Sequence, residues 1–369
     1  MKRSFISCNL CLLALLFLLL LNACGQSHTA ESVLADYLER VERTTGVDGQ
    51  NHWQIAMGPY PSHRERKLVV KEIRIGMTDF LKFYGCELFN LVSERNSIMG
   101  KLMPVSQKLV YEVQFLRQAE DCYVELAEKK GRNKEFLRAF MEILQAKRAN
   151  LPIIFWNATF DSPELQKAFS LAVKPLAPGE QAAYAQSLQS IQYFYELGRK
   201  LQHATLKINL DELEEQYFIL QSHQYGGRLL QSIRQLIAYL NQAAHALEVL
   251  FEKRPICYRN KPSSTARILR NVFIKYYVGQ IGPYLSQIYQ QGKNWLGEIN
   301  RLVAIQEIRI PTAFAEYQTQ MLSLEKGLWR HFNDAIHRHT QAWQAILNQC
   351  DFVPGSENSN ALHKVDFLG

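Results

Sequence analysis

The spacing of apolar residues along most of this chain predicts α-helices. Between residues 229 and 250, apolar positions recur at alternating gaps of four and three. This heptad pattern is typical of long helices packed side by side. Residues 285–302 repeat it. We expect these apolar seams to pack within the chain rather than against a partner coiled coil.

The first half of the chain also shows helical spacing, in shorter pieces. A short amphipathic helix is expected over residues 32–43. Residues 77–95 are apolar on both sides of one predicted helix, which indicates a buried helix. A second helix opens near Pro104 and ends before Gly131, so the two are expected to form an antiparallel hairpin. A third helix is predicted over residues 134–149.

Segments without a helical period lie between these helices. Residues 44–66 mix Gly, Pro and isolated aromatic residues, which predicts a loop over the body. Residues 67–75 are rich in β-branched residues but have no partner strand, so we expect an extended stretch or one helical turn. Prolines recur over residues 150–179, and helices are not expected to cross that run. Ser162 followed by Pro163 predicts a short helix start.

The second half reads as helix after helix. Gly226 and Gly227 are expected to break one of them, and Pro311 to open the longest, whose apolar stripe shifts at Gly327. The pattern therefore predicts an all-α fold, an elongated multi-helix bundle of long antiparallel helices with coiled-coil-like seams. The expected segments are a signal peptide (1–23), an N-terminal helical subdomain with the hairpin (24–150), a Pro-rich connection (151–179), a C-terminal long-helix bundle (180–350) and a flexible tail (351–369).

The first residues of the chain have the layout of an export signal. Lys2 and Arg3 precede an unbroken apolar run over residues 10–21, which is shorter than the roughly 20 residues a membrane-spanning helix needs. The run ends in Leu-Asn-Ala-Cys at Cys24, and this ending resembles the lipobox of bacterial lipoproteins. An uncleaved helix and an ordinary secretory signal are the alternatives.

The lipobox resemblance implies that Cys24 becomes the lipidated first residue of the mature protein. Several acyl chains on one residue are enough for stable membrane attachment, whereas one chain binds only marginally. In lipoproteins of two-membrane bacteria, Asp after the cysteine tends to mark inner-membrane retention. Gly25 at that position therefore favours the outer membrane, with the protein on its periplasmic side.

Charge excludes one class of partner. The full chain has 42 basic and 35 acidic residues. Removal of the signal takes away Lys2 and Arg3, which leaves 40 basic residues and a net charge of +5 spread along the chain. Nucleic-acid proteins carry a clustered basic stripe instead, so we expect no nucleic-acid partner. A weak attraction to anionic lipid or cell-wall polymer is compatible with this charge.

Four cysteines remain in the mature chain besides Cys24. Cys8 and Cys11 leave with the signal, and an even number in an oxidising compartment predicts two disulfides. Residues placed symmetrically about a hairpin turn face each other in antiparallel helices, and the second pair would join two helix ends. The favoured pairing is Cys86 with Cys122 and Cys257 with Cys350. The two other pairings and four buried free thiols stay open.

The densest polar stretch between two apolar helices is residues 93–104. There, and at residues 74–76 and 114–117, the chain resembles an uncharacterised family of gammaproteobacterial lipoproteins, a domain of unknown function with no assigned activity. The resemblance covers most of the mature chain and implies no catalytic residue. We interpret part of the stretch as a candidate interaction loop, made of Glu94, Arg95, Asn96, Ser97 and Lys101. The alternative is a capped hairpin turn tied by an ion pair between Glu94 and Lys101.

No stretch predicts a cofactor or a metal. His331, Asp334, His337 and His339 lie close in sequence, but His339 falls on the apolar stripe of its helix, so a core or edge histidine is expected. Glycine-rich nucleotide loops and hydrolase nucleophile motifs do not occur.

The expected location at the outer membrane and the lack of catalytic motifs favour a binding function over an enzymatic one. We expect a non-catalytic scaffold or binding module held by lipid at the outer membrane, with an unidentified envelope protein or cell-wall polymer as its partner. The alternative is a periplasmic hydrolase acting on cell-wall material, which two convergent carboxylates in a cleft would favour.

Overall fold

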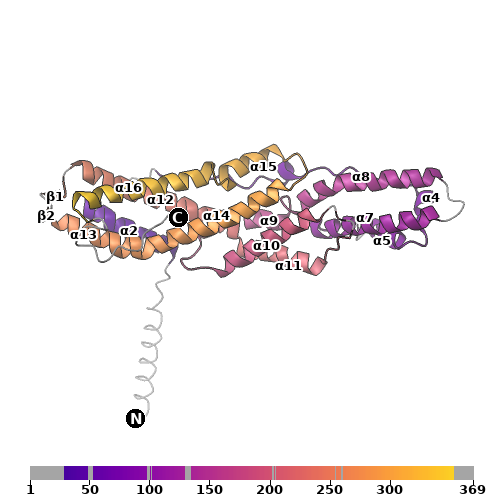
Figure 1. Ribbon diagram of the computed structural model, residues 1–369, viewed down its shortest axis with the longest axis horizontal. Helices are drawn as coiled ribbons and strands as arrows, with labels where there is room; N and C mark the ends of the chain where they lie inside the picture. Colours follow the sequence, from indigo (N-terminus) through magenta and orange to yellow (C-terminus); the bar gives the residue numbers. More distant parts are fainter. Residues whose placement is uncertain are drawn as a thin grey trace, which may run out of the picture.

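The computed structural model describes residues 29–48, 53–97, 100, 102–128, 134–201, 203, 205–253, 255–258 and 261–352. The expected signal peptide, Cys24, and all but the first two residues of the expected tail lie outside them. The described residues form an elongated body made almost entirely of helices (Figure 1). The expected all-α bundle is therefore confirmed.

The elements follow one another along the whole chain. In order they are α2 (Ala30–Thr45), α3 (His63–Arg66), α4 (Met77–Phe80), η1 (Leu81–Phe83), α5 (Glu87–Asn96), α7 (Val105–Glu128), α8 (Lys134–Ala158), α9 (Pro163–Ala168), α10 (Ala182–Arg199), α11 (Leu210–His223), α12 (Tyr225–Lys253), β1 (Cys257–Tyr258), β2 (Lys261–Pro262), α13 (Ser264–Val272), η2 (Phe273–Ile281), α14 (Gly282–Ala304), α15 (Thr312–Tyr317), η3 (Gln318–Leu322) and α16 (Gly327–Gln349).

Two ends of the body are built from different parts of the chain. Helices α4, α5, α7 and α8 make one end, and α2, α12, α13 and α16 with the two short strands make the other (Figure 1). In the small hairpin, Cys257 pairs with Pro262 and Tyr258 with Lys261. Helix α2, although first in the sequence, packs on α12, α13 and η2, so the expected N-terminal subdomain contributes helices to both ends.

The predicted seams form the core. Every seam position of α12 is buried, as are those of α14, and α12 packs along α16 and against α14. These side chains meet neighbours within the chain, as long antiparallel helices require. Among the described residues, no helix has both the length and the apolar character to cross a membrane.

The single buried helix expected over residues 77–95 was wrong. The chain forms α4 and η1, turns at Gly85, and starts α5 after Cys86. Gly85 has a φ of 97°, a conformation that favours glycine and ends a helix. As a result only one side is buried: Met77 is 72% exposed and Tyr84 is 77% exposed.

The expected helix end before the Pro-rich run was also wrong. Helix α8 continues to Ala158 with Pro152 inside it. A proline removes one helical hydrogen bond. Burial of Leu151, Ile154, Phe155 and Trp156 on the same helix offsets that loss, since each large apolar side chain contributes roughly 1.5–3 kcal/mol. The expected start at Ser162 is confirmed, because its hydroxyl accepts from the backbone N–H of Leu165 and caps α9.

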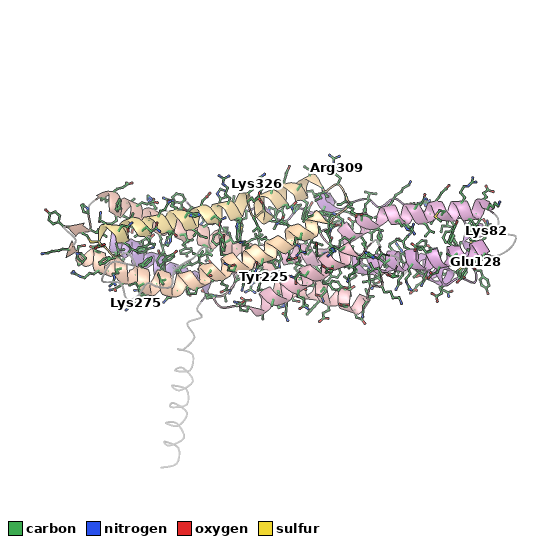
Figure 2. The ribbon with its side chains drawn as sticks, in the orientation of Figure 1. Lys82, Glu128, Tyr225, Lys275, Arg309 and Lys326 are labelled. Carbon is green, nitrogen blue, oxygen red and sulfur yellow. A yellow bond between two sulfur atoms is a disulfide. The ribbon has the colours of Figure 1, made fainter. Side chains whose placement is uncertain are left out.

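Gly226 and Gly227 do not break a helix as expected. They lie inside the first turn of α12, beside Tyr225, which Figure 2 labels near the middle of the body. The chain turns one step earlier, at Gln224, whose φ is 48°. A Cβ on Gly227 would lie 1.9 Å from the backbone oxygen of Ser170. The glycine is there because the segment after α9 passes too close for a side chain.

The long helix expected from Pro311 is interrupted. It forms α15 and η3, leaves the helical path over residues 323–326, and resumes as α16. Gly327 takes a φ of 57°, and a Cβ there would lie 2.1 Å from the oxygen of Gln320. The shift of the apolar stripe at Gly327 is therefore a break between two helices.

An extended segment over residues 67–76 runs beside α8, in agreement with one of the two expected forms. Hydrogen bonds to α8 hold its backbone. The side chain of Asn157 bonds both the N–H and the carbonyl of Leu68, at 3.0 and 2.8 Å, and Asn150 Nδ2 donates to the carbonyl of Lys71 at 2.8 Å. The segment thereby becomes one wall of a cleft.

Candidate binding cleft

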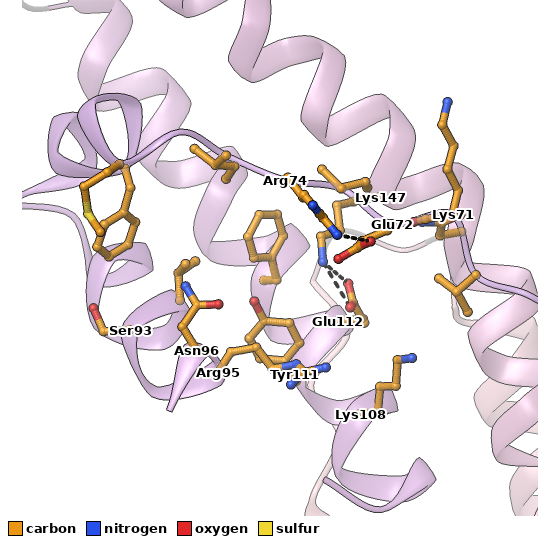
Figure 3. Close-up of a pocket in the computed structure, with 18 residues that line it drawn as sticks. Lys71, Glu72, Arg74, Ser93, Arg95, Asn96, Lys108, Tyr111, Glu112 and Lys147 are labelled. Atoms are coloured by element: carbon orange, nitrogen blue, oxygen red, sulfur yellow. Dashed lines mark hydrogen bonds and ion pairs between the residues drawn. The ribbon is translucent and has the colours of Figure 1, made fainter. Parts of the chain in front are cut away.

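A cleft of about 690 Å³ lies near the end of the body formed by α5, α7 and α8 (Figure 3). Its walls are these three helices and the extended segment over residues 70–75. A volume of this size is within the usual range of small-molecule sites. Its basic lining residues are Lys71, Arg74, Arg95, Lys108 and Lys147, and its acidic ones are Glu72 and Glu112.

Both carboxylates of the lining are paired with a basic side chain. Lys147 Nζ lies 3.0 and 2.8 Å from the two oxygens of Glu112, and both side chains are largely buried, at 14% and 8% exposed. Arg74 and Glu72 form a 2.9 Å pair at the rim, where both are exposed. Such an exposed pair contributes little to stability, typically less than 1 kcal/mol.

Lys108 is a half-buried cation of the cleft lining. Among the described residues it has no hydrogen-bond or ion-pair partner. Burial lowers the pKa of Lys108, and the nearby cations Arg95, Lys147 and Lys67 lower it further, while Glu112 acts in the opposite direction. Since Glu112 is already engaged by Lys147, the charge of Lys108 is only partly balanced.

Tyr111 forms the floor beside these cations. The Arg95 guanidinium lies 5.7 Å from the centroid of the Tyr111 ring, and Lys147 Nζ lies 5.4 Å from it. Cations over an aromatic face are attracted by its quadrupole. Burial raises the pKa of the Tyr111 hydroxyl, so it stays a neutral hydrogen-bond donor. In Figure 3 this hydroxyl points into the cleft, and it has no hydrogen-bond partner among the described residues.

The expected interaction loop meets this cleft in part. Arg95 and Asn96 line it, and the Arg95 guanidinium donates to the carbonyl of Gly100. Glu94 is exposed and does not line the cleft, while Ser97 Oγ accepts from the N–H of Gly100 at 3.1 Å. Lys101 lies outside the described residues, and with it the expected ion pair to Glu94.

Sequence reasoning missed the other side of the site, Lys108, Tyr111 and Glu112 on α7 and Lys147 on α8. A signal was present, because Lys108 and Glu112 stand four residues apart within an otherwise apolar stretch and therefore share one face of the helix. The sequence does not show that α8 and the extended segment close over that face.

The structure brings the two favoured cysteine pairs to disulfide distance. The Cα atoms of Cys86 and Cys122 lie 5.6 Å apart, and those of Cys257 and Cys350 lie 5.3 Å apart. The first bond ties the start of α5 to α7, two of the helices that line the cleft. The second ties the short hairpin to the end of α16.

The histidine-rich stretch of α16 does not converge. His339 is fully buried in the core, whereas His331, Asp334 and His337 are exposed. Within the described ranges, no three side chains of the kinds that bind metal gather into a group.

A second polar cluster fixes the loop before the extended segment. Arg66 is fully buried, with its guanidinium 3.5 Å from the carboxylate of Asp161, and His63 Nδ1 lies 2.9 Å from the same carboxylate. Arg66 also donates to Gln166 at 3.0 Å. Burial raises the pKa of Asp161, and its contacts with His63 and Arg66 oppose the rise. These contacts attach α3 to the turn between α8 and α9.

Fold and cleft together define an elongated helical protein with a basic, ligand-sized cleft towards an end. The chain belongs to the family described as "Protein of unknown function (DUF3080)", which it matches over residues 34–354. That match takes in the cleft and all four paired cysteines. No curated protein and no solved structure matches the chain.

Proposed function

We propose that this protein is a non-catalytic binding module of the cell envelope, anchored by lipid on Cys24 at the outer membrane and facing the periplasm. Its ligand or partner occupies the basic cleft. The observation that carries this proposal is the cleft itself, in which five basic side chains meet two carboxylates, both already paired. A site with such a surplus suits recognition of an acidic cell-wall or envelope component.

The short link to the proposed anchor supports this placement. Thr29 caps α2, whose buried face packs on α12 and α13. Four residues lie between Cys24 and Thr29, and the five steps from one to the other span at most about 18 Å. The flank of the body that carries the start of α2 would therefore stay close to the membrane.

The cleft gives little support to the alternative, a cell-wall hydrolase. Hydrolysis of glycosidic bonds needs one carboxylic acid and one carboxylate on either side of the scissile bond. Glu112 is engaged by Lys147 through both oxygens, and Glu72 is paired with Arg74 at the exposed rim. Each carboxylate of the cleft therefore already contacts a basic side chain of the protein.

Sedimentation with insoluble peptidoglycan separates the two functions. The soluble form that lacks residues 1–24 should co-sediment with purified peptidoglycan and release no fragments into the supernatant. Fragments that disappear with Glu112→Gln would instead establish the hydrolase.

A photo-crosslinker at Ser93, an exposed residue of the cleft lining, tests the site in cells against envelope proteins as well. The control position is Lys275, which Figure 2 shows at the opposite end of the body. Adducts at Ser93 and not at Lys275 are expected. Absence of both sedimentation and Ser93 adducts would overturn the proposed function.

A further inference from the structure

The cleft is lined by more basic than acidic side chains, so its positive charge is not neutralised by its own residues. Arg95, Lys108 and Lys147 come from three different helices and line the same cleft, and Arg95 and Lys147 lie over the Tyr111 ring. Arg95 and Lys147 both lower the pKa of Lys108, and Glu112 opposes them. Like charges in a partly dehydrated site repel each other more than they would in water. One carboxylate does not balance three cations, so the cleft is suited to a further negative charge from a ligand.

We propose that the cleft binds its ligand through an anionic group, a carboxylate or a phosphate, held in an anion seat formed by Arg95 and Lys108. This inference rests on the proposed function and names the chemistry that the site selects. Lys147 does not belong to the seat, because both Glu112 oxygens engage it. Its place is to hold Glu112 away from the bound anion.

Each group of the seat has a donor to offer. The Lys108 ammonium has no hydrogen-bond or ion-pair partner among the described residues. Arg95 uses part of its guanidinium on the Gly100 carbonyl, and this contact orients the remaining N–H groups. A guanidinium presents several donors in a fixed plane, which suits two oxygens of one anion.

The rest of the cleft indicates the remainder of the ligand. Met77, which is 72% exposed, and Phe80 line the same cleft on the side of α4. An anion that also carries an apolar portion would cover these side chains and gain from their burial. The site thus fits an amphiphilic anion better than a small inorganic ion.

Isothermal titration of the soluble form lacking residues 1–24, at pH 7 and low salt, tests the seat with two defined probes. Pyrophosphate represents the phosphate source, and propane-1,2,3-tricarboxylate represents the carboxylate source. We expect one equivalent of at least one probe to bind, more weakly as salt is added. The stronger probe identifies the source.

Variants assign the binding to the seat. Lys108→Met and Arg95→Gln should each weaken binding by tenfold or more, and Lys108→Arg should restore part of it. Lys275→Met, an exposed change at the opposite end of the body, should leave the affinity unchanged. Circular dichroism of every variant shows whether a loss of binding comes from the changed anion site or from unfolding of the protein.

Several results would overturn the inference. They are no binding of either probe by the wild type, binding that survives Lys108→Met and Arg95→Gln, and equal losses in Lys275→Met. If peptidoglycan sedimentation or Ser93 adducts persist in that case, the proposed function stands and only the anionic seat fails. If they are absent too, both fail.

Discussion

The hydroxyl of Tyr37 in α2 lies 2.6 Å from Nε2 of His339 in α16, and both side chains are fully buried. Trp343 Nε1 donates to the same Tyr37 oxygen at 2.8 Å. The Tyr37 hydroxyl therefore bonds Trp343 and His339 at once. This chain of bonds fastens α2, the first described helix, to α16, the last.

Removing the Tyr37 hydroxyl should destabilise the whole body. Tyr37→Phe leaves both Trp343 Nε1 and His339 Nε2 buried without a partner, which costs about 1–3 kcal/mol. Urea unfolding followed by circular dichroism measures the change. Tyr84→Phe is the matched control, because Tyr84 is 77% exposed. Equal stability of the two variants would contradict the role of the Tyr37 bond.

His339 should make the fold sensitive to mild acid. Burial lowers the pKa of His339 from 6.5 to about 3. The unfolded chain takes up this proton below pH 6.5 and the folded chain does not, so stability present above pH 6.5 is lost as the pH falls towards 3. At pH 5 the loss from this group is about 2 kcal/mol.

His339→Gln tests that assignment, because a Gln oxygen can still accept from Tyr37 and does not titrate. The free energy of unfolding of this variant should fall by about 2 kcal/mol less than that of the wild type between pH 7.5 and pH 5. Parallel pH profiles of wild type and variant would show that His339 is not the titrating group.

The two disulfides should both stabilise the protein but affect the cleft differently. They close loops of 36 and 93 residues, and loss of either should cost about 2–5 kcal/mol. Of the two, the first joins α5 and α7, which line the cleft, whereas the second joins elements that do not. We therefore expect Cys86→Ser/Cys122→Ser to weaken anion binding and Cys257→Ser/Cys350→Ser to leave it intact in the folded fraction.

Peptide mapping without reduction checks the pairing itself. A peptide joining Cys86 to Cys122 and another joining Cys257 to Cys350 are expected from the exported protein. Linkage of Cys86 to Cys257, or four thiols that react with iodoacetamide, would contradict it.

In the absence of ligand, Lys108 should lower the free energy of unfolding of the protein. Burial and neighbouring cations disfavour its charged form, so Lys108→Met is expected to raise the free energy of unfolding by about 0.5 kcal/mol. Chemical denaturation at pH 7 measures this difference. A clear loss of stability would show that Lys108 supports the fold instead of serving a ligand.

Lipidation is tested by changing one residue outside the described part of the chain. Cys24→Ala should leave an uncleaved precursor that takes up no labelled palmitate, because the sulfur that would carry the lipid is gone. Density-gradient fractions of the wild type test Gly25 in turn, and we expect the protein with outer-membrane markers. Unchanged labelling, or a position with inner-membrane markers, would contradict the respective prediction.

Much of the helical content could be predicted from the sequence because it depends on local spacing. The seams of α12 and α14 repeat with the period of a helix, and any residue on such a stripe must be buried somewhere. The Cys86–Cys122 pair also came within reach, since the distance along two antiparallel helices from a shared turn is fixed by the rise per residue, and the Cys257–Cys350 pair followed from the expectation that it joins two helix ends. Short-range geometry was enough in both cases.

The positions where helices end depend on tertiary contacts with segments that are distant in the sequence. Pro152 stays inside α8 because residues on the same helix are buried, and Gly227 sits within α12 because the Ser170 backbone presses on it. A proline or glycine looks the same in the sequence whether or not such a neighbour exists. The expected breaks at these positions therefore failed.

The cleft was decided by tertiary structure alone. The sequence by itself determined a largely helical chain with a polar stretch that includes Arg95, and the export signal that it predicts lies outside the described residues. Only packing placed Arg95 beside Lys108 and Tyr111, and closed the space with an extended segment bound to α8. Charges from separate elements interact through distance in space, which the order of residues does not encode directly.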